Sequence, residues 1–142
     1  DFVWKWAPDG NYKYENFTLS AEYMLLDSIV ESKFEAAPNA PKDLAAYYVS
    51  GVYRFSPNWS AGVRYGEAEG FEGHAHNHNG HQHLHLTAKE DKETDLMVTW
   101  ESSHFGAIRG QLSRVENQDN KTDNVFTLQY VMTFGAHGAH AF

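Results

Sequence analysis

Histidine is concentrated in one short stretch of the sequence. Six of the nine histidines lie in the segment GHAHNHNGHQHLH, residues 73–85, at alternate positions in two rows. The first row is His74, His76 and His78, and the second is His81, His83 and His85. In an extended chain, residues i and i+2 share a side and lie about 6.6 Å apart, so neighbouring imidazoles can converge on one ion. The spacing predicts affinity for transition metals.

The residues around the two rows favour the same chemistry. Asn79 and Gly80 form a dipeptide that favours a tight turn, which would bring the rows face to face. Facing rows offer four nitrogens to a tetrahedral Zn²⁺, or a squarer set to Cu²⁺ or Ni²⁺. We therefore expect loosely bound zinc, with copper, nickel or cobalt as alternatives. A polar loop of drifted composition, or a tag-like insertion, is the interpretation without a metal.

Two further histidines lie near the end of the sequence. His137 and His140 are three residues apart in a stretch of glycine and alanine. They form a candidate second metal site, and a flexible tail is the alternative interpretation.

The segments on either side of the histidine rows alternate between apolar and polar residues. In NVFTLQYVMTFG, residues 124–135, the even positions from Phe126 to Phe134 are all large and apolar. A period of two is strand geometry. The same alternation occurs in residues 1–7, 17–25, 47–55, 59–66, 95–101 and 107–114. The pattern predicts an all-β fold of seven antiparallel strands with no helix.

Composition and motifs exclude several classes of function. The formal net charge is −8 and the lysines and arginines form no basic run, which argues against nucleic-acid binding. The chain has no cysteine, and therefore no disulfide and no thiolate metal site. No nucleophile elbow, His-Glu-x-x-His motif or phosphate loop occurs. We expect a protein that is not an enzyme.

Alternating strands fit either a soluble barrel with an apolar interior or an outer-membrane barrel with a polar lumen. Aromatic residues gather near the strand ends, where an interfacial girdle would lie. The polar faces carry charges suited to a wet lumen. The residues predicted to line that lumen are Arg54, Arg64, Arg109, Glu22 and Glu101. These features favour an up-and-down transmembrane β-barrel, with a soluble lipocalin-like barrel as the alternative.

The connections between the predicted strands alternate in length. Short turns such as SPN, residues 56–58, alternate with longer polar segments. In bacterial outer-membrane barrels the short turns are periplasmic and the long loops extracellular. The pattern therefore predicts that residues 67–93 form an extracellular histidine-rich loop within a single barrel domain, 1–142.

The C-terminal strand carries a family resemblance. Counting back by twos from Phe142 reaches Phe134 and Tyr130 in the last apolar row, with departures at Gly138 and His140. This arrangement resembles the C-terminal signal that the barrel-assembly machinery reads in outer-membrane proteins. The chain resembles the C-terminal part of bacterial porin-like outer-membrane proteins, including zinc-related ones. The resemblance implies the outer membrane of a Gram-negative bacterium, with membrane lipid and the assembly machinery as partners.

The number of strands bears on whether the barrel is complete. Such barrels have an even number of strands, whereas seven are visible here. The count predicts the C-terminal part of a larger barrel, of about twelve strands or more. A missed or split strand, giving about eight, is the alternative.

These observations lead to one main functional hypothesis. A porin-like barrel captures transition-metal ions, zinc first, on its histidine-rich loop for passage through a polar lumen. A structural or adhesive surface barrel and a soluble lipocalin-like binding protein are the alternatives.

Overall fold

The computed structural model describes residues 1–27, 43–78, 81–103, 105–117 and 121–134, with backbone only for residue 27 and for the parts of 71–88 among them. Within these ranges the chain forms seven strands and one short 3-10 turn, η1 (Pro8–Gly10). The strands are β1 (Phe2–Trp6), β2 (Asn16–Asp27), β3 (Asp43–Ser56), β4 (Trp59–His78), β5 (His81–Ser103), β6 (Gly106–Glu116) and β7 (Thr122–Met132). Among these residues, no helix has the length and hydropathy of a membrane-crossing segment.

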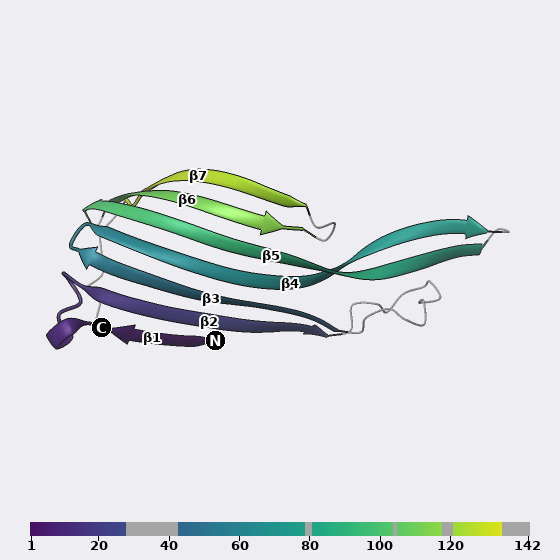
Figure 1. Cartoon of the computed structure of the whole chain (residues 1–142), viewed down its shortest axis with the longest axis horizontal. Coiled ribbons are helices and arrows are strands. Elements are labelled where there is room, and N and C mark those ends of the chain that lie inside the picture. Colours follow the sequence, from purple (N-terminus) through teal and green to yellow (C-terminus); the bar gives the residue numbers. More distant parts are fainter. Residues whose placement is uncertain (28–42, 79–80, 104, 118–120, 135–142) are drawn as a thin grey trace.

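The strands form one open antiparallel sheet in the order of the chain, β1 to β7 (Figure 1). Each strand therefore pairs with its sequence neighbours. The prediction of seven antiparallel strands from the period of two is confirmed.

The register gives the sheet one apolar and one polar face. Cross-strand partners share a face, and the pairs Val63↔Leu96 and Leu96↔Leu112 extend the apolar face from β4 to β6. This face lies open, with Leu128 69% exposed. The side chains that are buried are all polar, and no apolar side chain among those described is buried. They are Ser60, Asp95, Thr99 and Ser113. The polarity is the reverse of a soluble β-sheet, which buries its apolar face.

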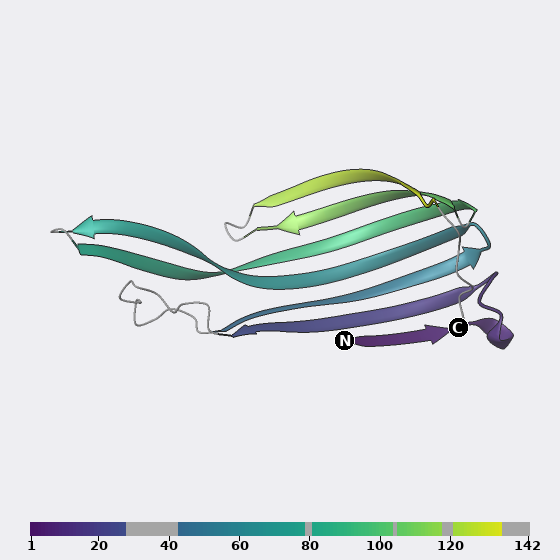
Figure 2. The ribbon, with the colours of Figure 1, turned by 180° about the vertical axis from the view of Figure 1, so that it is seen from behind.

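The polar side chains are buried from solvent by the sheet itself, because no described element is stacked on either face (Figures 1 and 2). Curvature of the sheet explains this burial if the polar face is the concave one, since side chains converge on a concave face and diverge on a convex one. At Gly62, a Cβ atom would lie 2.6 Å from the Met97 Cε and 3.1 Å from the Gly51 carbonyl oxygen. A side chain at this position would require the Met97 side chain and the neighbouring strand to shift.

Residues 67–93 differ from the expected loop. They continue β4 and β5 as paired strands up to His78↔His81. The register of β3 on β4 ends at Ala68, and that of β6 on β5 ends at Lys92. Beyond these points, 69–78 and 81–90 form a two-stranded extension, here called the histidine ribbon (Figures 1 and 2). This backbone pairing agrees with the extended, facing rows that the histidine spacing predicts, whereas the alternation of apolar and polar residues ends before them.

Candidate functional site

The backbone register pairs the two histidine rows across the ribbon. The partners are His74↔His85, His76↔His83 and His78↔His81. Alternate residues of a strand share a face, and so do cross-strand partners, so all six positions belong to one face of the ribbon. Their side chains lie outside the described part of the structure.

That histidine face is continuous with the polar face of the sheet. The register of β4 on β5 runs without a bulge from Trp59↔Trp100 to His78↔His81. Because a one-residue slip would exchange the faces, an unbroken register keeps Arg64, Asp95 and the histidine positions on one side. The ribbon twists as it leaves the sheet, so this face winds about the ribbon axis (Figure 1).

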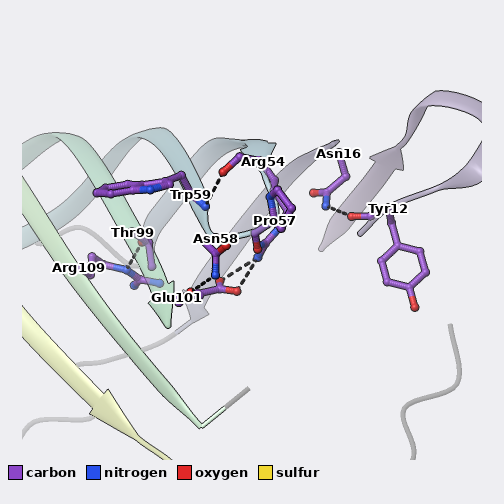
Figure 3. Close-up of polar contacts among 10 residues, drawn as sticks. Tyr12, Asn16, Arg54, Pro57, Asn58, Trp59, Thr99, Glu101 and Arg109 are labelled. Carbon is purple, nitrogen blue, oxygen red and sulfur yellow. Dashed lines mark hydrogen bonds and ion pairs between the residues drawn. The ribbon is translucent and has the colours of Figure 1, made fainter. Parts of the chain in front are cut away.

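One end of the sheet carries the short turn Pro57–Asn58 between β3 and β4, and it is called the short-turn end here. On the polar face at this end, an ion pair joins β3 to β5 across β4. The Arg54 Nη2 atom donates to both Glu101 carboxylate oxygens, at 2.8 and 2.9 Å (Figure 3). Arg54 Nη1 also donates to the Pro57 carbonyl oxygen at 2.8 Å, and Asn58 Nδ2 donates to the Glu101 carbonyl oxygen at 2.6 Å. The turn between β3 and β4 is thereby fastened to the end of β5.

Two of the other charged residues expected on this face, Arg109 and Arg64, contact a hydroxyl and an aromatic ring. Arg109 Nε donates to Thr99 Oγ1 at 3.2 Å (Figure 3). The Arg64 guanidinium lies over the Tyr48 ring, 4.7 Å from its centroid. Glu22 pairs in register with Tyr48 on the same face. All five residues predicted to line a lumen therefore lie on one face, and Arg54 and Glu101 form an ion pair with each other.

A hollow of about 240 Å³ lies beside the Arg54–Glu101 pair, lined by both partners together with Thr18, Ser60, Thr99 and Arg109. The hydroxyl residues in this lining were not singled out from the sequence. The buried Ser113, which donates to an Asp95 carboxylate oxygen, was missed as well. A signal was present, because these small polar residues share strand parity with the arginines.

The apolar face ends in aromatic and charged rows. Trp59↔Trp100 lies at the short-turn end, and Tyr65 lies toward the other end. Beyond Tyr65, Glu67 accepts a hydrogen bond from the Tyr65 hydroxyl and lies 3.6 Å from the Lys92 Nζ atom. Hydrogen bonds from the hydroxyls of Tyr65 and then Tyr47 lower the pKa of the Glu67 carboxyl. A hydrogen bond with Glu90 raises the pKa of Lys92.

Several predicted site residues lie outside the described ranges, namely His137, His140 and Phe142. Of the predicted assembly signal, Phe134 is 83% and Tyr130 63% exposed. Among the side chains that the structure describes, no group of three or more His, Asp and Glu residues could hold a metal ion. Comparisons of the chain with protein-family models, with curated proteins and with solved structures find no match.

Proposed function

We propose that this chain is part or all of a porin-like β-barrel of the bacterial outer membrane, and that its histidine ribbon captures transition-metal ions, zinc first, for passage through a polar lumen. The observation that carries the proposal is the reversed polarity of the sheet: Asp95 is 3% exposed on the polar face, while Phe126 is 70% exposed on the apolar face.

The free energy of removing apolar side chains from water favours contact between the apolar face and lipid. Removing one large apolar side chain from water is worth about 1.5–3 kcal/mol. A soluble lipocalin-like barrel obtains this gain by turning its apolar face inward. Here the polar face is the crowded one, so the gain requires an apolar medium outside the sheet.

The dimensions of the apolar face agree with a bilayer. On β4, Trp59 is followed by Ala61, Val63 and Tyr65, and the first charge, Glu67, comes eight residues after Trp59. Eight residues span about 26 Å along a strand, or about 20 Å in height at a tilt of about 40°. Outer-membrane barrels carry an apolar band about 25 Å tall, flanked by aromatic girdles. The tryptophan and tyrosine rows match such girdles.

The connections support an orientation. The two-residue turn Pro57–Asn58 lies at one end of the sheet, and the ribbon extends from the other (Figure 1). Short turns are periplasmic in this class of barrel. The ribbon is therefore extracellular, at the mouth of the lumen.

The binding and release of metal ions follow from the protonation state of the histidine imidazoles. A neutral imidazole donates a lone pair to a metal ion, whereas the protonated ring cannot. Ions bound to the ribbon enter a polar face whose charges include Arg64, Asp95 and the Arg54–Glu101 pair. Protonation near pH 6 releases them.

Calorimetric titration with Zn²⁺ at pH 7.5 and pH 5.5 tests the capture role. We expect binding at the higher pH that is lost at the lower one. Equal binding at both values, or none at either, rejects capture.

A structural or adhesive surface barrel is the competing function, and the polar contacts that join β3, β4 and β5 at the short-turn end favour it. Conductance in a planar bilayer separates the two. A transporting barrel conducts ions, whereas a scaffold closed by these contacts does not.

A further inference from the structure

The register of the histidine ribbon carries an inference that deepens the proposed capture function and rests on it. We propose that each cross-strand histidine pair is one metal-binding unit, so that the ribbon holds a ladder of up to three transition-metal ions that brace its two strands. The ladder is the set of register pairs His74↔His85, His76↔His83 and His78↔His81.

Distances along and across the ribbon favour cross-strand units. Directly opposite residues of an antiparallel pair have Cα atoms about 4.5–5.5 Å apart, whereas residues i and i+2 of one strand are about 6.6 Å apart. The closest histidine positions therefore come from different strands. Each unit supplies two nitrogens, and water completes the coordination shell. Ions held this way exchange readily, as capture followed by release requires.

The ribbon also gains from such ions. Among the strands that the structure describes, those of the ribbon pair only with each other beyond Ala68 and Lys92, so no third described strand extends the ribbon. An isolated two-stranded hairpin is marginally stable in water. A ligand that binds only the paired arrangement stabilises it by mass action. An ion held by both strands is such a ligand, and uptake therefore orders the ribbon.

Two double variants with the same number of histidines separate this ladder from an unstructured pool of imidazoles. His76→Gln/His83→Gln removes one complete pair and leaves two. His76→Gln/His85→Gln breaks two pairs and leaves one. Zn²⁺ is titrated into the full chain in detergent at pH 7.5, and the number of ions bound is compared with wild type.

The ladder predicts a loss of about one third of the bound zinc in the first variant and about two thirds in the second. Equal losses in the two variants, with wild-type binding intact, overturn the ladder but leave the capture role standing. No binding to wild type overturns both.

Amide hydrogen exchange gives a second measurement that a simple affinity for imidazoles would not affect. With the ladder, Zn²⁺ slows exchange in 71–78 and 81–88 of wild type and of His76→Gln/His83→Gln. It slows exchange less in His76→Gln/His85→Gln. Binding without any change in exchange overturns the bracing role.

Discussion

At the scale of single residues, the polar face depends on a few specific partnerships. The Arg54–Glu101 pair is the clearest, because one nitrogen contacts both carboxylate oxygens and the side chains are only 21% and 39% exposed. The Arg114–Glu116 pair has a similar N–O distance of 2.9 Å, but its side chains are 60% and 47% exposed. The two pairs therefore form a matched comparison.

Glu101→Gln should lower the free energy of unfolding by about 1 kcal/mol, because it leaves the Arg54 charge without its counterion in a partly sheltered place. Glu116→Gln should cost less than about 0.5 kcal/mol, because water screens an exposed pair. Urea unfolding in lipid vesicles measures both. Equal costs would contradict the special role of the Arg54 pair.

Glu67 should make the free energy of unfolding depend on pH in the acidic range. Its pKa in the folded chain is lowered from the ordinary 4.5, so its contribution is present above that value and is lost as pH falls through the lowered pKa. Wild type should therefore lose stability below about pH 4.5, and Glu67→Gln should lose less over the same range.

Tyr65→Phe removes the hydrogen bond that contributes most to the lowered pKa of Glu67. The stability of this variant should therefore fall less steeply than that of wild type below about pH 4.5. Unfolding midpoints measured at successive pH values provide the comparison. Parallel profiles for wild type and both variants would show that these hydrogen bonds do not influence folding.

At the scale of the strand, the two faces of β6 should respond differently to charge. Leu112 is 50% exposed on the apolar face, and Gln111 lies beside it on the polar face. A lipid-facing arginine near the midplane costs about 2–4 kcal/mol. Leu112→Arg should reach that range, and Gln111→Arg should stay below about 1 kcal/mol. Unfolding in vesicles measures both, and a neutral Leu112→Arg would indicate that water contacts this face.

Crowding on the polar face of β4 should make Gly62 intolerant of a side chain. Gly62→Ala should destabilise the sheet by about 1–3 kcal/mol, as overpacking does, because the new Cβ meets Met97 and the Gly51 carbonyl. Adding Met97→Ala should recover part of the loss. Gly110→Ala is the control, since its Cβ would meet only Phe126 at 3.9 Å. Equal effects at the two glycines would argue against a concave, crowded polar face.

At the scale of the whole molecule, the apolar face is one continuous surface that carries all four tryptophans. Trp4, Trp6, Trp59 and Trp100 are 38–48% exposed on it. In a bilayer these rings contact lipid, so brominated phospholipids should quench most of the tryptophan emission and aqueous iodide little of it. Strong iodide quenching in vesicles would contradict a lipid-facing sheet.

The sequence by itself determined the strands and their faces, because a period of two is a local property of the chain. It placed Arg54, Arg64 and Arg109 on one side and Leu128 and Tyr130 on the other, and the register agrees. It also put each histidine row on one side of its strand, since His74, His76 and His78 are two residues apart.

Only the tertiary structure decided which face is sheltered, which residues are partners and where pairing stops. Arg54 and Glu101 are 47 residues apart, and their contact depends on the register of three strands. The burial of Asp95 depends on the curvature of the sheet, which no single strand encodes. Residues 67–93, expected as a loop, contain the histidine ribbon because backbone pairing of β4 with β5 continues beyond the apolar residues. These properties arise from pairing between distant segments, whereas the alternation of side chains is set within each strand.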